Sequence, residues 1–209
     1  MKRGWFITLE GPDGCGKSTQ AGILAERLKA AGYPVRLTRE PGGTPLAEGF
    51  RRLILDPKNR VHPLTELFLY EASRAQHTEE VIRPALAEGI IVVSDRYSDA
   101  TVAYQGYGRK IPLKTVTTLN QIAARGLKPH LTLLLEVSER STRERTQGRR
   151  KDRMENEKVS FLARVRSGYR AIARKEPQRV KLVNGEGSAR EVAERIWAVV
   201  RAKIGGKRV

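Results

Sequence analysis

The chain has 209 residues and a formal net charge of +17, because 40 lysines and arginines outnumber 23 aspartates and glutamates. Its length suits a single domain with a well-buried core, and its one cysteine, Cys15, excludes an intrachain disulfide. We find no secretory signal and no apolar run long enough to cross a bilayer, so we expect a cytoplasmic protein without a membrane partner. The charge suits phosphate-rich partners, although a solvated, arginine-rich surface would give the same balance.

Short apolar runs alternate with helical patterns along the whole chain. Strands are expected at residues 5–9, 35–38, 90–94, 131–136 and 180–183. Helices are expected at residues 17–31, 46–55, 63–88, 113–125, 139–146, 155–175 and 189–203. This alternation predicts an α/β fold with a parallel sheet and right-handed crossovers. No internal repeat or linker divides the pattern, so we expect residues 1–209 to form one domain.

Residues 11–18 read GPDGCGKS, a complete Gly-x-x-x-x-Gly-Lys-Ser phosphate loop. An expected strand precedes it and an expected helix follows, so backbone amides at the helix N-terminus can hold phosphate oxygens. Lys17 is expected to reach the β- and γ-phosphates of a nucleotide, and Ser18 to join a Mg²⁺ shell. The residues predicted to bind the nucleotide are Gly11, Pro12, Asp13, Gly14, Cys15, Gly16, Lys17, Ser18 and Thr19.

Two further strand ends carry charged residues. The second strand runs into Arg39 and Glu40 before a Pro-Gly-Gly turn, and the third runs into Asp95 and Arg96. Because ligands of parallel sheets collect at the carboxyl ends of the strands, we expect both arginines to bind an anion. Asp95 stands where nucleotide-binding proteins with this loop place a carboxylate near Mg²⁺; the alternative is a plain ion pair with Arg96.

A polar, glycine-containing segment from Gln147 to Arg153 predicts a flap between two helices. Such a run of like charge is usually a solvated face. Near a nucleotide, however, one arginine closing on the transferring phosphoryl group can contribute about 10³-fold or more to its transfer. We therefore expect replacement of Arg153 by alanine to lower turnover far more than ATP affinity. The arginines in and before the flap are Arg140, Arg143, Arg145, Arg149, Arg150 and Arg153.

No pattern in the chain offers a general base for activating water or an alcohol. A phosphate acceptor is already anionic and needs positive charge rather than a base. The combination favours a nucleoside monophosphate as the acceptor. A kinase for a deoxynucleoside remains open, as does a nucleic-acid-dependent ATPase, for which the net charge is the best argument. The Asn-Lys-x-Asp guanine signature of GTPases is absent.

Six motifs resemble the thymidylate kinase family: LEGPDGCGKSTQ, TREPGGTPLAE, LYEASRAQH, SDRY, AYQGYGR and DRMENE. The resemblance runs from the phosphate loop to about Tyr169 and is weaker beyond it. It implies a P-loop kinase fold, with a five-stranded parallel sheet flanked by helices. It also implies transfer of the γ-phosphate of ATP to dTMP with Mg²⁺, giving dTDP for dTTP synthesis. The family is typically homodimeric, and we expect no specific nucleic-acid partner.

The resemblance also implies roles for individual residues. The expected catalytic residues are Asp13, Lys17, Arg96, Arg149 and Arg153. The expected metal ligands are Ser18 and Asp95. The expected dTMP-binding residues are Arg39, Glu40, Arg51, Tyr70, Arg74, Arg96, Thr101, Tyr104 and Gln105. Among these, Arg39, Arg51 and Arg96 would hold or approach the phosphate, and Arg74 would bond the thymine edge.

The ring of Tyr70 would stack on thymine, although helical spacing alone would also make it ordinary core. Thr101 and Gln105 would line the base pocket, and Tyr104 would lie under the sugar, disfavouring a 2′-hydroxyl. Two departures from the family pattern matter. Gly14 stands where some relatives carry an arginine in the loop, which implies the subtype whose lid, here about residues 147–155, supplies it. Ala100 replaces a serine that relatives often have.

Overall fold

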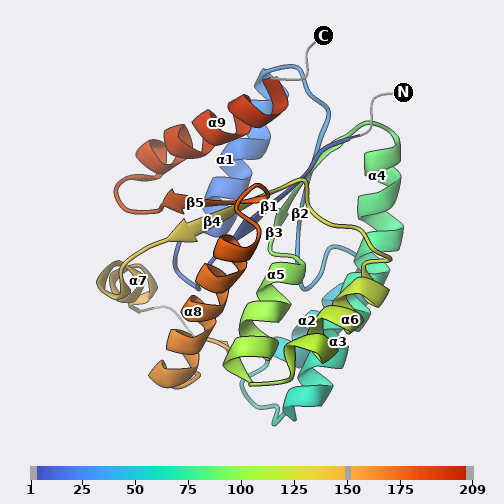
Figure 1. The fold of residues 1–209 in the computed structure, drawn as a ribbon, viewed down its shortest axis with the longest axis vertical. Coiled ribbons are helices and arrows are strands. Elements are labelled where there is room, and N and C mark those ends of the chain that lie inside the picture. The colour runs from blue at the N-terminus through green and yellow to red at the C-terminus, as the bar shows by residue number, and fades with distance from the viewer. Residues whose placement is uncertain (1–3, 149–151, 206–209) are drawn as a thin grey trace.

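The computed structural model of the protein describes residues 4–148 and 152–205, so the flap predicted at 147–155 lies partly outside it. Within these residues five parallel strands form one sheet in the order β2-β3-β1-β4-β5 (Figure 1). The strands are β1 (Phe6–Glu10), β2 (Val35–Arg39), β3 (Ile91–Asp95), β4 (Leu131–Glu136) and β5 (Val180–Asn184). The predicted α/β fold is confirmed, and each predicted strand is present within one residue of its expected bounds.

Helices connect the strands and cover the sheet. The helices of the described residues are α1 (Lys17–Ala30), α2 (Pro45–Leu55), α3 (Pro63–His77), α4 (Arg83–Ala87), α5 (Ser98–Thr101), α6 (Leu113–Ala123), α7 (Glu139–Thr146), α8 (Val159–Lys175) and α9 (Ala189–Gly205). Two π-helical segments, η1 (Thr78–Ile82) and η2 (Val102–Gly108), continue α3 and α5. None of the described helices is long and apolar enough to cross a membrane.

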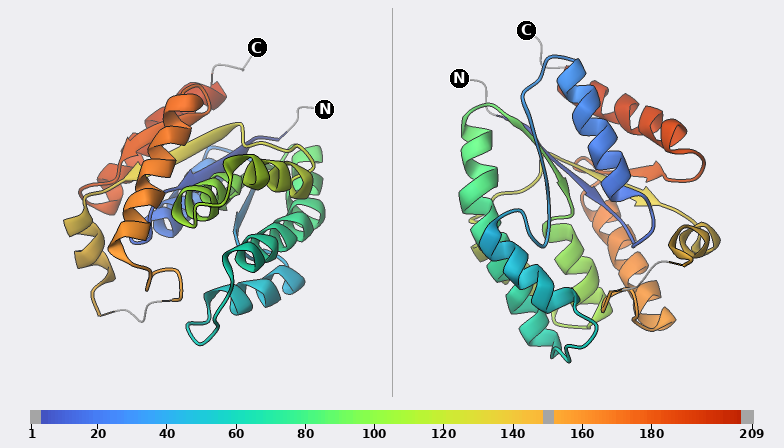
Figure 2. Two further views of the ribbon diagram at one scale, coloured as in Figure 1. Left: turned by 60° about the horizontal axis from the view of Figure 1, so that its bottom comes forward. Right: turned by 180° about the vertical axis from the view of Figure 1, so that it is seen from behind.

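The central strand β1 is buried on both faces, as expected for a parallel sheet between helical layers. Successive side chains of a strand point to opposite faces. Ile7 and Leu9 pack in a core cluster with residues of α1 and α9, whereas Phe6 packs with Ile82 and Tyr97 on the other face. Figure 2 shows the helices on the two sides of the sheet. This two-sided burial fixes the position of β1, and hence of the loop that follows it.

The helix predicted from residue 63 to residue 88 is interrupted. The structure has α3, η1 and α4 in succession, with a π-helical turn at Thr78–Ile82. Pro84 stands in the first turn of α4, and without an N–H it cannot donate to the carbonyl one turn earlier. The wider turn before it also lets the buried hydroxyl of Thr78 bond the hydroxyl of Tyr97 at 2.9 Å.

Helical structure at residues 98–108, in α5 and η2, was not predicted from the sequence. Gly106 and Gly108 have poor helix propensity, so local pattern argues against a helix there. Packing requires one of them, because a Cβ on Gly108 would lie 2.7 Å from the ring of Phe161 in α8. Tertiary contact therefore overrides local preference in this segment.

The helix predicted from residue 155 begins at Val159 instead. Asp152 accounts for the difference, because its Oδ1 accepts the backbone N–H groups of Met154 and Glu155 at 2.8 and 2.9 Å. This local side-chain bonding holds residues 152–157 as turns, an arrangement that aspartate favours over a helix interior.

The carboxyl ends of β1, β2 and β3 lie side by side. Asp95 at the end of β3 is in register with Leu9 of β1 and with Arg39 of β2. The loops that follow these strands therefore open at the same edge of the sheet, as the sequence predicted.

Candidate active site

The phosphate loop joins β1 to α1 and depends on glycine at its bends. Gly11, Gly14 and Gly16 have φ angles of 138°, 76° and 96°, values that other residues rarely adopt. A Cβ on Gly11 would lie 2.6 Å from the carbonyl oxygen of Leu135 in β4. The buried Lys17 bends back over the loop, and its Nζ donates to the carbonyl oxygen of Pro12 at 2.9 Å. The loop thus presents amides and an ammonium group to an anion.

Ser18 and Asp95, the two residues predicted to bind a metal, meet beside the loop. The hydroxyl of Ser18 donates to Oδ2 of Asp95. Oδ1 of Asp95 is buried and accepts no hydrogen bond from the described residues. A hydroxyl and a carboxylate with a spare oxygen suit Mg²⁺, which prefers oxygen ligands and usually keeps water or phosphate in its shell. The described residues contain no cluster of three or more His, Cys, Asp or Glu that could hold a metal alone.

Asp13 of the phosphate loop is bonded to two side chains from the β3–η2 region. Its Oδ1 accepts from Nη2 of Arg96 at 2.5 Å, and its Oδ2 accepts from the hydroxyl of Tyr104 at 2.8 Å. Burial alone would raise the pKa of Asp13, but the charges of Arg96 and Lys17 hold that pKa well below its usual range. The site therefore favours the ionised form of Asp13.

Arg96 is fixed by several partners at once. It adopts a φ of 72°, and its Nη1 donates to the carbonyl oxygen of Gly11 at 3.0 Å and to the hydroxyl of Tyr169 at 2.9 Å. Its guanidinium carbon lies 5.0 Å from the centre of the Tyr104 ring. A left-handed conformation in a non-glycine residue is strained and persists where the surroundings hold it, typically at functional sites.

Behind Arg96 lies a buried carboxyl group, Glu10. Its Oε2 accepts from the hydroxyl of Tyr169 at 2.8 Å, and its Oε1 accepts from the N–H of Tyr97 at 2.7 Å. Burial and the nearby charge of Asp99 raise the pKa of Glu10 to about 8, although Arg96 opposes that shift. The sequence did not single out Glu10, since a glutamate ending a strand gives no sign of burial.

A hollow that we call the inner pocket lies beside these groups; it has an empty volume of about 540 Å³ and is open to solvent. It contains every residue predicted to bind dTMP except Arg39. The lining residues are Asp13, Glu40, Pro41, Arg51, Leu55, Tyr70, Arg74, Arg96, Tyr97, Ala100, Thr101, Tyr104, Gln105, Asp152 and Met154. Besides Ala100, the lining residues not assigned to a site from the sequence are Pro41, Leu55, Tyr97, Asp152 and Met154. All of these five but Leu55 lie in the motifs TREPGGTPLAE, SDRY and DRMENE, which were the available signal.

Arg74 is buried at the wall of the inner pocket and is held from several sides. Its Nε donates to Glu40 and its Nη2 to Thr101, at 2.9 and 2.8 Å. Its Nη1 donates to Glu71 at 2.9 Å and to Asn120 at 2.6 Å. These bonds use four of the five guanidinium N–H groups. One N–H on Nη2 is left to meet a ligand.

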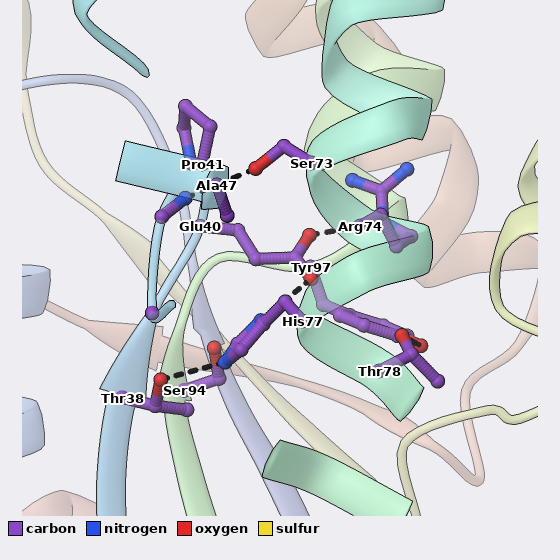
Figure 3. Close-up of polar contacts among 12 residues, drawn as sticks. Thr38, Glu40, Pro41, Ala47, Ser73, Arg74, His77, Thr78, Ser94 and Tyr97 are labelled. Atoms are coloured by element: carbon purple, nitrogen blue, oxygen red, sulfur yellow. Dashed lines mark hydrogen bonds and ion pairs between the residues drawn. The ribbon is translucent and has the colours of Figure 1, made fainter. Parts of the chain in front are cut away.

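Glu40 lies between Arg74 and His77, as Figure 3 shows. His77 is fully buried; its Nδ1 is 3.0 Å from Oε1 of Glu40, and its Nε2 is 2.7 Å from the hydroxyl of Thr38. A carboxylate only accepts hydrogen bonds, so Nδ1 carries the proton that joins the ring to Glu40. The chain of contacts fixes Glu40, and through it Arg74.

A second hollow, which we call the loop cleft, runs along the phosphate loop. Arg39 lies here and not in the inner pocket; it is half-exposed and pairs with Glu48 at 3.0 Å. The described residues that line the loop cleft are Asp13, Gly14, Gly16, Lys17, Ser18, Thr19, Ala21, Leu37, Thr38, Arg39, Glu40, Arg51, Asp95, Arg96, Arg145, Thr146, Asp152 and Glu155. The lining residues shared by the inner pocket and the loop cleft are Asp13, Glu40, Arg51, Arg96 and Asp152.

The flap arginines are only partly accounted for. Arg149 lies outside the described residues. Arg153 is described, but it lines neither hollow: its Nε donates to the carbonyl oxygen of Ile54 at 2.7 Å and its Nη1 pairs with Glu66 at 2.7 Å. The prediction that Arg153 points at a transferring phosphate is therefore not supported, because its guanidinium is engaged elsewhere. Arg145, which does line the loop cleft, was noted only as part of the flap.

Several known proteins are similar to this chain in sequence and in fold. A family model for thymidylate kinase matches residues 9–196. The thymidylate kinase of a Synechococcus strain is 48% identical over 201 residues, covering 95% of this chain and 95% of that protein. The thymidylate kinase of Syntrophotalea carbinolica is 49% identical over 201 residues, covering 92% and 93%. The crystal structure of thymidylate kinase from Ehrlichia chaffeensis superimposes with a TM-score of 0.78 at 34% identity, over 95% of this chain and 99% of that chain.

Proposed function

Because the chain belongs to the thymidylate kinase family, we propose that its two hollows divide between them the transfer of the γ-phosphate from ATP to dTMP. ATP binds along the loop cleft and dTMP enters the inner pocket, giving dTDP for dTTP synthesis. The observation that carries this assignment is that both hollows share Asp13, Arg51 and Arg96. A phosphoryl group passing between two bound nucleotides would cross at these residues, and the whole chain would act as one nucleoside monophosphate kinase domain.

The donor side holds the phosphates of ATP. The amides of the phosphate loop bind the phosphate oxygens, and Lys17 neutralises charge on the β- and γ-phosphates. Ser18 and Asp95 would hold Mg²⁺, and the spare buried oxygen of Asp95 supports this role. When bound, the ion neutralises charge that develops on the transferring group.

The acceptor side needs no general base, because the attacking phosphate oxygen of dTMP is already anionic. Arg96 and Arg51 hold that phosphate, and Arg39 approaches it from the loop cleft. Asp13 orients Arg96 through their hydrogen bond. The arginines offset the repulsion between the two phosphate groups, which is the main obstacle to this reaction.

The base and sugar of dTMP occupy the rest of the inner pocket. The remaining N–H of Arg74 would bond a thymine carbonyl, with Glu40 holding the guanidinium in place. Tyr70 would stack on the base, and Tyr104 would lie against the sugar. Thr101 and Gln105 complete the wall. Arg149 stays a predicted contact to the transferring phosphate, on sequence grounds alone.

We also infer that the enzyme acts in the cytoplasm as a homodimer. Helices α3 and α6 lie side by side (Figure 1) and expose large apolar side chains. Phe68 is 51% exposed and Ile122 is 66% exposed, and Leu64 and Leu113 add to the same pair of helices. Grouped apolar residues of this kind are typical of protein interfaces. Light scattering should give twice the mass of one chain, and Phe68→Glu should shift it to that of a monomer.

An ADP-release assay with a panel of monophosphates tests the function. We expect turnover with dTMP to exceed that with dUMP, dCMP, UMP and AMP. ADP release that requires DNA or RNA instead of a monophosphate would overturn the proposal.

A further inference from the structure

Glu66, in the first turn of α3, is a fully buried carboxylate outside the residues assigned so far. Its Oε1 accepts from Nε2 of Gln105 at 2.8 Å and from Nε of Arg109 at 3.0 Å. Its Oε2 accepts from Nη2 of Arg109 at 2.8 Å and pairs with Nη1 of Arg153 at 2.7 Å. One buried negative charge therefore holds two guanidinium groups and an amide that come from distant parts of the chain.

Burial would raise the pKa of Glu66, but its hydrogen bonds from Arg109 and Gln105 keep that pKa below its usual value. Arg109 has a second partner, Glu157, at 2.6 Å. Arg153 has no second carboxylate among the described ion pairs. If Glu66 were neutral, less negative charge would offset the two guanidinium groups. Arg153 would lose its one carboxylate partner among the described ion pairs, whereas Arg109 would keep Glu157.

Two of the partners of Glu66, Gln105 and Arg153, are connected to the wall of the inner pocket. Gln105 lines the pocket directly. Arg153 stands between Asp152 and Met154, which both line it. Glu66 thus contacts two walls of the inner pocket. It bonds Gln105 in the η2 wall, and it pairs with Arg153 in the wall made by Asp152 and Met154.

Arg153 also binds the segment to the end of α2. Its Nε donates to the carbonyl oxygen of Ile54, and its backbone N–H donates to that of Leu55 at 3.1 Å. Its side chain is 11% exposed, and its Nη2 is buried without a hydrogen-bond partner among the described residues. A guanidinium so enclosed is directed into the protein and away from the loop cleft.

We propose that Glu66 is a positioning residue for the acceptor: by binding Arg153 and Gln105 together, it holds the 152–154 wall and the η2 wall of the inner pocket at the spacing dTMP needs. Arg153 acts through Glu66 on dTMP binding and not on the transferring phosphate. This inference rests on the proposed function, since it concerns the residues around the acceptor of the same reaction.

A double-mutant cycle tests the inference. The variants are Glu66→Gln, which removes the charge but keeps an acceptor oxygen, Arg153→Met, and the two combined. We expect each single change to raise the KM for dTMP by about tenfold, the worth of one charge-assisted hydrogen bond, with little change in kcat or in the KM for ATP. The double variant should be no worse than the poorer single variant, because the two residues act as one unit.

Three outcomes would overturn the inference. Arg153→Met could lower kcat by about 10³-fold at unchanged dTMP KM, which is the signature of an arginine on the transferring phosphoryl group. The two single effects could multiply in the double variant, or the single changes could leave the dTMP KM unaltered. The double variant contains neither an unpaired Glu66 nor an unpaired Arg153, so it stays informative if a single variant unfolds. Urea unfolding of all three variants shows which of them are folded.

A matched control uses an exposed pair far from the site. Arg27 and Glu194 join α1 to α9 through bonds of 2.8 and 3.1 Å, and their cycle, Arg27→Met with Glu194→Gln, should leave the dTMP KM unchanged. Wild-type protein inactive on dTMP would remove the proposed function itself. If the wild type is active on dTMP and the Glu66 and Arg153 variants have the same dTMP KM as the wild type, only the proposed role of Glu66 is refuted.

Discussion

The hydroxyl of Tyr104 donates to Oδ2 of Asp13 at 2.8 Å, which joins the inner pocket to the phosphate loop. The bond links the residue that we place against the dTMP sugar with the residue beside the transferring phosphoryl group. It also shares Asp13 with Arg96, whose Nη2 lies 3.2 Å from the same hydroxyl. The hydrogen bond from Tyr104 to Asp13 therefore connects the proposed donor and acceptor sites.

Tyr104→Phe removes that bond and keeps the ring. We expect kcat/KM for dTMP to fall by about tenfold to a hundredfold, the usual worth of a hydrogen bond to a charged group. Discrimination between dTMP and the ribonucleotide should persist, because it depends on the bulk of the ring. Steady-state kinetics with both nucleotides checks this; loss of discrimination with unchanged dTMP kinetics would contradict it.

Asp95→Asn keeps the size of the side chain and removes its charge. Because Asp95 and Ser18 are the proposed protein ligands of Mg²⁺, we expect the Mg²⁺ concentration for half-maximal activity to rise by about tenfold or more. The dTMP KM should change little, since Asp95 lies in the loop cleft and not in the inner pocket. A Mg²⁺ titration identical to that of the wild type would refute the assignment.

Arg74→Ala should raise the KM for dTMP more than the KM for ATP, because Arg74 lines only the inner pocket. The same change leaves Glu40 and Glu71 buried without their shared partner, so unfolding should become easier by about 3–5 kcal/mol. Kinetics in both substrates and urea unfolding measure the two effects. Equal increases in the two KM values would argue against a contact with the base.

The raised pKa of Glu10 leads us to expect that the stability of the protein depends on pH. Its pKa is about 8 in the folded protein against 4.5 as the ordinary value, so between those values the folded state holds a proton that the unfolded state has lost. This contribution to stability is complete below pH 4.5 and falls as pH rises toward 8, by about 1.4 kcal/mol per pH unit at most.

Glu10→Gln removes that titration while keeping oxygen and nitrogen atoms for the same neighbours. The difference in unfolding free energy between the wild type and Glu10→Gln should therefore change in favour of the variant from pH 5 to pH 8. Parallel pH profiles for the two proteins would show that Glu10 is not protonated in the folded state.

Two glycines give opposite predictions for stability. Gly108→Ala places a methyl group 2.7 Å from the Phe161 ring, so we expect a loss of about 1–3 kcal/mol. Gly22→Ala lies within α1 with open space around it, so we expect a gain of about 0.5–1 kcal/mol. Thermal unfolding of both variants, with circular dichroism as the probe, checks the signs.

Local pattern and motif were enough to predict the strands, the phosphate loop and most of the inner pocket. Strand β4 is buried from Leu131 to Leu135 because both faces of the sheet are covered, and its leucine-rich run carries that signal in the sequence. The partner of a charged residue cannot be read from local pattern in the same way: Arg153 and Glu66 are far apart in the chain, and the tertiary fold brings them together. The direction of a side chain is equally hidden: the sequence marks Arg39 at a strand end, but only the structure places it in the loop cleft, paired with Glu48.

Helix α3 carries Glu66, Tyr70, Arg74 and His77 at intervals of three or four residues, and it exposes Leu64 and Phe68 to solvent. One helix thus carries residues of the proposed base site, of the proposed wall contact and of the proposed subunit contact. A change of its tilt would disturb all three together, so redesign for another nucleotide has little freedom there. Redesign of the wall from Ala100 to Gln105 is coupled to the same helix, because Thr101 bonds Arg74 and Gln105 bonds Glu66.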